Sequence, residues 1–178
     1  MNPIKNLSSY SDTAEYHPYD ANLPMAFNEV KRLIQEVLPD IQVEHVGSSS
    51  IPGVGGRNVI DMVIPAADPD QAAIKQHLYA LGFQDSPFRH FLPLLVGVIA
   101  FQGHGYPILL YVLSPESEVY ADWITFRDYM RAHAEDAQAY DTVKQQAIAA
   151  GKVEGGRYQQ AKTPFLVSVM AKIQQAKP

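Results

Sequence analysis

The chain contains no cysteine among its 178 residues. This absence excludes disulfide bonds, thiolate metal ligands and cysteine nucleophiles, and it leaves histidine and carboxylate side chains as possible metal ligands. Long apolar runs are missing as well. The longest, Phe91 to Phe101, contains Pro93 and is far shorter than the roughly 20 residues that span a bilayer. Residues 1–10 include no apolar segment of the kind found in signal peptides. We therefore expect a cytoplasmic protein with no membrane partner.

A strong excess of charge is also lacking, because 14 Lys and Arg stand against 19 Asp and Glu, a net charge of −5. A mildly acidic chain is not attracted as a whole to nucleic acid, so nucleic acid is not indicated as a partner. A phosphate site would have to be a local cluster. The P-loop, the dinucleotide fingerprint and the Gly-x-Ser-x-Gly elbow are all absent. The composition, 47% hydrophobic, is typical of a folded protein and favours one domain over residues 1–178.

The order of expected elements predicts an α+β fold. After an irregular lead-in over residues 1–23, apolar spacing and turn residues alternate between strand and helix patterns. The predicted strands are 41–46, 59–64, a short one near Phe83, 94–101 and 108–113. The predicted helices begin after Asn22, at Asp68, at Ser117, at about Glu135 and at Thr163-Pro164. This order indicates a mixed sheet with helices mainly on one face and a helical part over residues 117–178. Arg89 and His90 fit either a cleft wall or the end of a surface strand.

The segment from His45 to Asp61 is the most informative part of the sequence. Gly47 permits a tight turn, and the backbone amides and hydroxyls of Ser48–Ser50 can converge on a phosphate. Arg57 adds a planar, charged hydrogen-bonding group. Asp61 lies within an apolar strand, where a carboxylate is costly unless it is paired or bound to a metal. An acid beside a phosphate-binding loop is a typical position for Mg²⁺, so Asp61 is the candidate metal ligand and catalytic residue.

The same residues have a purely structural explanation. Loops rich in Gly and Ser are most often turns, and an acid on a strand often accepts hydrogen bonds from the amides of a neighbouring loop. His45 ends a strand beside the turn. It fits a neutral imidazole that hydrogen-bonds to the turn as well as it fits a catalytic base. From these residues alone, both interpretations stay open.

Two further basic groups are candidate ligand-binding residues. Arg127 lies on a predicted helix, where it can either reach a bound anion or pair with Asp128 and other acids. Lys162 precedes the predicted start of the last helix, with Tyr158 one turn earlier. Because the start of a helix favours anions, Lys162 can strengthen an anion site there, or it can be an ordinary exposed lysine.

The segment also carries a resemblance to a known family. The run from His45 to Gly53, His-Val-Gly-Ser-Ser-Ser-Ile-Pro-Gly, with Arg57 and Ile60-Asp61, resembles the signature of the GrpB family. Three further blocks resemble that family, so the likeness spans nearly the whole chain. These blocks are Tyr19-Asp20, the run Phe126 to His133, and Tyr158 with Lys162 and Phe165. The family has a nucleotidyltransferase-like fold, and some members are fused to dephospho-CoA kinase. The resemblance implies that a nucleotide or phosphorylated metabolite binds at the Gly47–Ser50 loop and Asp61, with or without Mg²⁺.

The chain departs from the wider nucleotidyltransferase pattern after Asp61. In that superfamily a second acid follows two residues later, and a third lies on a later strand. Here the second position is Val63, and the strand over residues 108–113 carries no acid. Leu109 and Tyr111 stand where the GrpB family often has a His-Leu-His-like run. Three functions therefore remain open: nucleotidyl transfer, non-catalytic binding of a nucleotide or phosphometabolite, and an interaction protein whose loop is structural.

Overall fold

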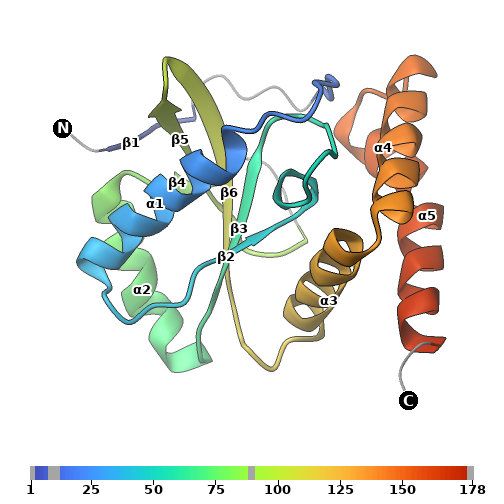
Figure 1. Ribbon diagram of the computed structural model, residues 1–178. Coiled ribbons are helices and arrows are strands. Elements are labelled where there is room, and N and C mark those ends of the chain that lie inside the picture. The colour runs from blue at the N-terminus through green and yellow to red at the C-terminus, as the bar shows by residue number, and fades with distance from the viewer. Residues whose placement is uncertain (1–2, 8–12, 88–90, 176–178) are drawn as a thin grey trace.

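The computed structural model describes residues 3–7, 13–87 and 91–175, so the expectation for Arg89 and His90 lies outside the described residues. In the described part of the chain, six strands form one mixed sheet in the order β1-β5-β6-β3-β2, and β4 pairs with β5 (Figure 1). The strands are β1 (Ile4–Lys5), β2 (Glu44–Val46), β3 (Ile60–Pro65), β4 (Gln84–Asp85), β5 (Leu95–Phe101) and β6 (His104–Leu113). β3 runs parallel to β6, and the other pairs are antiparallel. The α+β class and the mixed sheet are as expected.

The helices lie on both sides of this sheet (Figure 1). α1 (Leu23–Val37) and α2 (Asp68–Leu81) cover one face, where the main hydrophobic core lies. A short 3₁₀ turn, η1 (Ser48–Ser50), follows β2. The helical C-terminal part consists of α3 (Glu118–Ala132), α4 (Ala134–Ala149) and α5 (Gly155–Gln175), which stand on the opposite side. None of the described helices has the length and apolar character needed to cross a membrane.

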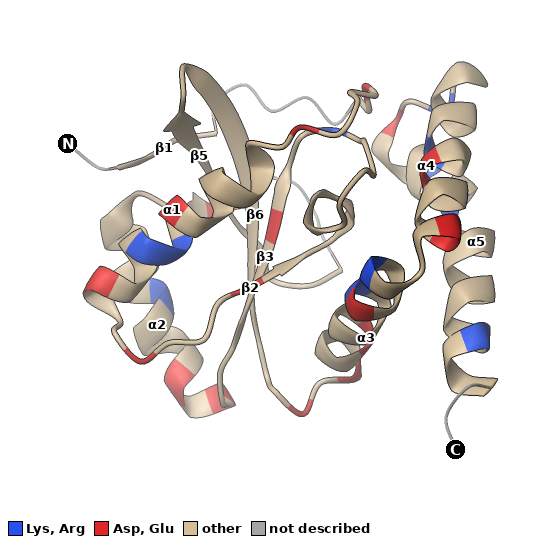
Figure 2. Ribbon diagram, in the orientation of Figure 1, with Lys and Arg blue, Asp and Glu red and all other residues tan. Residues whose placement is uncertain are grey.

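Strand β3 presents its side chains to both layers, because successive residues of a strand point to opposite faces. Ile60, Met62 and Ile64 are buried in the main core beneath α1 and α2. Asp61 and Val63 therefore face the C-terminal helices. The strands carry few charged residues (Figure 2), so Asp61 is an isolated acid in the middle of the sheet.

β2 and β6 begin at Glu44 and His104 rather than at residues 41 and 108, and two other elements differ more from the sequence expectation. Within the supposedly irregular lead-in, Ile4 and Lys5 form β1 at the sheet edge against β5. The last helix begins at Gly155 rather than at Thr163, so the prediction of its start was wrong and Pro164 lies inside α5. The first turns of α5 include Tyr158, whose side chain is buried. We attribute the early start to this burial, since packing outweighs the low helix propensity of glycine.

Candidate functional site

A cavity of about 820 Å³ lies between the sheet and the C-terminal helices. This volume is in the usual range of small-molecule sites, roughly 300–1,000 Å³. Its walls come from β2 and β3, the loop through η1 to Asn58, β6, and the helices α3, α4 and α5. Of the residues predicted to form a site, the lining includes Gly47, Ser48, Ser49, Arg57, Asp61, Tyr158 and Lys162. Ser50, His45 and Arg127 are not part of it.

Asp61 and Gly47 meet at the base of this cavity. The pairing of β2 with β3 places Val46 opposite Asp61, so Gly47 comes next to the carboxylate. Gly47 has φ +67° and ψ −174°, a conformation that is essentially restricted to glycine. A Cβ atom at this position would lie 2.8 Å from Cγ of Asp61, which is closer than side-chain packing allows. The serine-rich bend and the acid therefore share one hollow, and glycine is what permits their contact.

Three cationic side chains surround this acid. Burial raises the pKa of Asp61 to about 6, and the nearby positive charges of Arg57, Lys162 and Lys144 oppose that rise. Burial and the charge of Arg57 lower the pKa of Lys162 to about 8. The ammonium group of Lys162 lies over the Tyr158 ring, 4.4 Å from its centroid, and forms no ion pair with any carboxylate in the described chain. The cavity lining thus places Arg57 and Lys162 near the Asp61 carboxylate.

Lys144 is the member of this group that the sequence analysis missed. Its side chain is only 1% exposed, and its ammonium group donates a hydrogen bond to the backbone carbonyl of Gly55. Burial, followed by the charge of Lys162, lowers its pKa to about 7. One sequence signal points to it. Lys144 occupies a buried position in an otherwise apolar helical stripe, with Ala137, Tyr140 and Ala147 at spacings of three and four residues.

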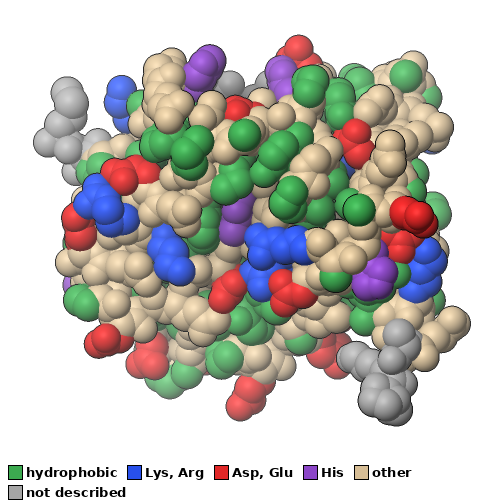
Figure 3. Space-filling model, in the orientation of Figure 1, with side chains coloured by type: hydrophobic (Ala, Val, Ile, Leu, Met, Phe, Trp, Pro, Cys, Tyr) green, Lys and Arg blue, Asp and Glu red, His purple; other side chains and the backbone are tan. Residues whose placement is uncertain are grey.

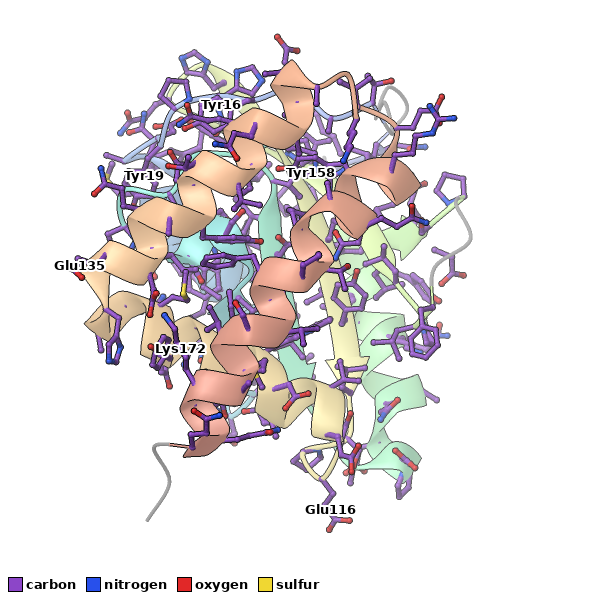
Figure 4. All side chains as sticks on the ribbon, turned by 90° about the vertical axis from the view of Figure 1, so that its right-hand side faces the viewer. Tyr16, Tyr19, Glu116, Glu135, Tyr158 and Lys172 are labelled. Atoms are coloured by element: carbon purple, nitrogen blue, oxygen red, sulfur yellow. The ribbon has the colours of Figure 1, made fainter. Side chains whose placement is uncertain are left out.

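Helix α4 and the lead-in segment hold the loop in place at Gly55. Asp141 accepts a hydrogen bond from the Gly55 amide at 2.8 Å, while Lys144 binds the carbonyl of the same residue. The hydroxyl of Tyr16 donates to Asp141 at 2.9 Å, and His17 pairs with Gly56 through two backbone hydrogen bonds. Figure 4 shows α4 and α5 side by side, with Tyr16 and Tyr158 near the same end of the pair. The loop is therefore fixed before any ligand arrives.

The three serines of the loop have different roles. The Ser50 hydroxyl donates to the carbonyl of Gly47 at 2.7 Å, and Ser49 shares a hydrogen bond of 3.0 Å with Nε2 of His45. Both side chains are buried and serve the turn. Across the residues that the structure describes, Ser48 Oγ has no hydrogen-bond partner. Ser48 is therefore the hydroxyl that remains available to a ligand.

His45 belongs to the interior, although it was a candidate site residue. Its ring stacks on Phe27 with centroids 4.5 Å apart and is 6% exposed. Burial, with the charges of Arg131 and Arg127, lowers its pKa to about 3. The imidazole is hydrogen-bonded to the turn, as in one of the two interpretations of the sequence, and its low pKa favours the neutral form.

This burial predicts acid sensitivity. Because the unfolded chain binds a proton at His45 near pH 6.5 and the folded chain only near pH 3, stability falls as the pH drops through this window. We expect His45 to contribute a loss of about 2 kcal/mol between pH 7 and pH 5. Asp61, whose pKa is raised, gives the opposite trend. Urea titrations at several pH values measure the free energy of unfolding. Between pH 7 and pH 5 this free energy should fall less in His45→Gln than in the wild type, and the control His77→Gln, at an exposed position, should fall as much as the wild type. If the free energy of unfolding of His45→Gln falls with pH as steeply as that of the wild type, the prediction is wrong.

Arg127 lies away from the cavity. Its guanidinium donates to Asp128 at 2.7 Å and to Glu44 at 2.5 Å, and it also bonds to the carbonyl of His45 at 3.2 Å. Arg131, one turn later, donates to the carbonyl of Ser50 at 2.8 Å. On the face of the molecule drawn in Figure 3, basic and acidic side chains lie side by side near the middle. Of the two possibilities left open by the sequence, pairing with Asp128 and another acid is the one observed, and Arg127 ties α3 to β2.

The donor set around Asp61 does not fit a resident Mg²⁺ ion. Within residues 3–7, 13–87 and 91–175, no group of three His, Cys, Asp or Glu side chains is arranged to hold a metal. The neighbouring position on β3 is Val63, and the facing positions on β6 are Leu109 and Tyr111. Mg²⁺ needs several oxygen ligands, and the three nearby cations oppose its approach. Any ion would have to arrive with the oxygen atoms of a ligand.

The family of this protein follows from a sequence match that covers most of the chain. A family model described as GrpB protein matches residues 13–172. The chain belongs to the GrpB family. A UPF0157 protein of Streptomyces coelicolor is 26% identical over 86% of this chain and 81% of its own. A UPF0157 protein of Halalkalibacterium halodurans is 28% identical over 85% of this chain and 78% of its own. A UPF0157 protein of Pseudomonas aeruginosa is 31% identical over 75% of this chain and 56% of its own.

Solved structures support the fold of this GrpB protein. The conserved protein GrpB from Enterococcus faecalis aligns with a TM-score of 0.63 at 16% identity, over 88% of this chain and 99% of that one. A chain of the GLD-2/RNP-8 complex aligns with a TM-score of 0.58 at 16% identity, over 82% of this chain and 50% of that one. The Cid1 poly(U) polymerase with MgGTP bound aligns with a TM-score of 0.54 at 14% identity, over 73% of this chain and 44% of that one. These likenesses show the nucleotidyltransferase-like fold that the sequence resemblance implied.

Proposed function

We propose that this GrpB protein binds a nucleotide or another phosphorylated small molecule in the cavity, with the phosphate at the Gly47–Ser48 bend. The observation that carries the proposal is that Arg57, Lys162, Asp61 and Ser48 line one cavity of ligand size, with Lys144 close enough to act on Asp61 through its charge. Cations that lie near one another repel, so an anion bound between them lowers the electrostatic free energy of the site.

Each lining group has a role in this proposal. Arg57 and Lys162 neutralise the phosphate charge, and Ser48 donates a hydrogen bond through its unpartnered hydroxyl. Lys144 lies beneath the loop and adds positive potential without touching the ligand, since its ammonium group is engaged by Gly55. Asp61 accepts a hydrogen bond from a hydroxyl of the ligand. The positive potential and the single acid thus orient the phosphate group, whose own protonated hydroxyl can serve as the donor to Asp61.

Non-catalytic binding is the form of this function that the site supports best. Metal-dependent phosphoryl transfer generally uses two ions about 3.5–4 Å apart, which several carboxylates hold. Here the second acid position is Val63, and β6, which pairs with β3, offers Leu109 and Tyr111 on this face rather than an acid. This chain shares its fold with the Cid1 poly(U) polymerase, but a shared fold does not by itself provide the carboxylates that bind metal ions. Nucleotidyl transfer remains the second candidate, and its mark would be a strict requirement for Mg²⁺.

The proposal predicts the effect of removing one cation. We expect Lys162→Met to weaken binding of pyrophosphate and nucleotides at least tenfold, because it deletes a charge that faces the cavity. The control Lys152→Met removes a lysine that is exposed on the connection between α4 and α5, and it should bind as the wild type does. Thermal melts with phosphate, pyrophosphate, AMP, ATP and UTP, with and without Mg²⁺, measure both variants.

The outcome also separates the two candidate functions. Stabilisation that persists in the presence of a chelator supports the binding function. Stabilisation that needs Mg²⁺ and disappears in Asp61→Asn supports transferase chemistry. No stabilisation by any of these phosphates at about 10 mM would refute the proposal, since a dissociation constant above that limit corresponds to less than about 3 kcal/mol of binding free energy.

A further inference from the structure

The two ends of the cavity differ in chemistry, and α5 shows the change most clearly. Four of its residues that line the cavity are spaced four apart: Tyr158, Lys162, Leu166 and Met170. The first two are polar and the last two are apolar. Because a helix rises 1.5 Å per residue, Lys162 and Met170 are about 12 Å apart along the axis. In Figure 4, Tyr158 marks one end of α5 and Lys172 lies toward the other.

The sheet changes in the same way along β3 and β6. Asp61 is paired with Leu109, and the next residues on that face are Val63 and Tyr111. The Tyr111 ring meets Trp123 of α3 edge-on, with centroids 4.9 Å apart. Val63 belongs to the same apolar cluster as Trp123. The sheet wall thus passes from the acid to aromatic and aliphatic side chains within two residues.

The apolar end has little capacity for hydrogen bonding. Most of its lining is apolar, from Leu92, Val119, Trp123, Phe126, Leu166 and Met170, and Tyr111 and the exposed Asp122 complete it. The polar groups among these side chains are the indole N–H of Trp123, the hydroxyl of Tyr111 and the carboxylate of the exposed Asp122. A nucleobase carries several donors and acceptors around its edge, and burying them without partners costs roughly 1–3 kcal/mol each. A body without such groups is buried there at no such cost.

We infer that the natural ligand is a phosphorylated small molecule with an apolar body, which lies along α5 from Lys162 toward Met170. This inference rests on the proposed function and narrows its ligand class. The phosphate occupies the cationic end, and the aliphatic or aromatic body occupies the end lined by Trp123 and Leu166. Shape and apolar contact, rather than hydrogen bonds, then select the body.

Three phosphate monoesters of similar charge test this arrangement: hexyl phosphate, glycerol 3-phosphate and AMP. Trp123 is the only tryptophan in the chain, so its fluorescence reports directly on the apolar end. We expect hexyl phosphate to bind at least tenfold more tightly than either of the other two and to change the Trp123 emission. Glycerol 3-phosphate should stabilise the protein in thermal melts and leave the emission unchanged.

Two variants on α5 provide a matched pair. Leu166→Gln places an amide in the apolar end, so the affinity for hexyl phosphate should fall to about that for glycerol 3-phosphate, which itself should not change. Val167→Gln makes a similar change at a side chain that is 63% exposed and outside the cavity lining, and it should bind all three esters as the wild type does. Hexanol, which has the body without the phosphate, should bind at least tenfold more weakly than hexyl phosphate.

The possible failures are distinguishable. If AMP or glycerol 3-phosphate binds as tightly as hexyl phosphate, the inference is overturned and the proposed function stands. An unchanged affinity for hexyl phosphate in Leu166→Gln, or equal binding of hexanol, also overturns the inference alone. If none of the three esters and no pyrophosphate binds, both the inference and the proposed function are overturned.

Discussion

Substitution of Gly47 by alanine should destabilise the protein by at least about 3 kcal/mol. Two separate costs add here. The backbone at φ +67° and ψ −174° is strained for any residue with a Cβ, which costs roughly 1–3 kcal/mol. The new methyl group would also overlap the Asp61 carboxylate, which is held in place by the pairing of β2 with β3. The free energy of unfolding, measured by urea denaturation, checks this value.

Gly53 is the matched control for this substitution. It also has a positive φ, +80°, but a Cβ there would meet no atom within 4 Å. We expect Gly53→Ala to cost only about 1–2 kcal/mol, the penalty of the backbone conformation alone. In the double variant Gly47→Ala/Asp61→Ala, part of the lost stability should return, because the carboxylate is gone. Equal costs for Gly47→Ala and Gly53→Ala would show that the bend and Asp61 are not in contact.

Lys144→Glu should have an effect of similar size, a loss of about 4 kcal/mol. Breaking a buried charged contact typically costs 3–5 kcal/mol, and here the substitution also replaces a positive charge with a negative one. The carbonyl of Gly55 would lose its hydrogen bond from Lys144, and the new carboxylate would lie close to Asp141. Urea denaturation measures the loss, and the melting temperature should fall with it.

Lys152→Glu makes the same change of charge at an exposed lysine. It should alter the free energy of unfolding by no more than about 0.5 kcal/mol, as is usual for surface positions. A loss below about 1 kcal/mol in Lys144→Glu would mean that the buried lysine does not support the loop. The contrast between the two variants therefore tests the clamp on Gly55 independently of any ligand.

The central part of the site was accessible from the sequence because its residues are close along the chain. Gly47-Ser48 and Asp61 are separated by residues 49–60, and the apolar run around Asp61 predicts a buried strand. Once that strand pairs with the one before it, the bend and the acid must meet. The bounds of α2, from Asp68 to Leu81, likewise follow from local signals at both ends.

The remainder of the site depends on contacts between distant residues, which a single sequence does not encode in its local pattern. Lys144 and Asp141 reach Gly55 across more than 80 residues. The start of α5 was misplaced because Gly155 and Gly156 resemble a chain break, although burial of Tyr158 extends the helix through them. Lys162 lines the cavity, but the local argument for it was wrong, since it lies in the second turn of α5 rather than before a helix start.

The contacts of the lead-in segment bear on how the protein folds as it leaves the ribosome. Ala14 donates its amide to the carbonyl of Val153, and His17 pairs with Gly56. Because the chain emerges from its amino end, Ala14 has to wait for more than 130 residues of further synthesis before its partner exists. The sheet and its first helices have their partners much earlier. The cavity is closed only after α4 and α5 have been synthesised, because Tyr140, Tyr158 and Lys162 line it, and a chain arrested before α5 would present the serine-rich bend without the wall that Tyr158 and Lys162 provide.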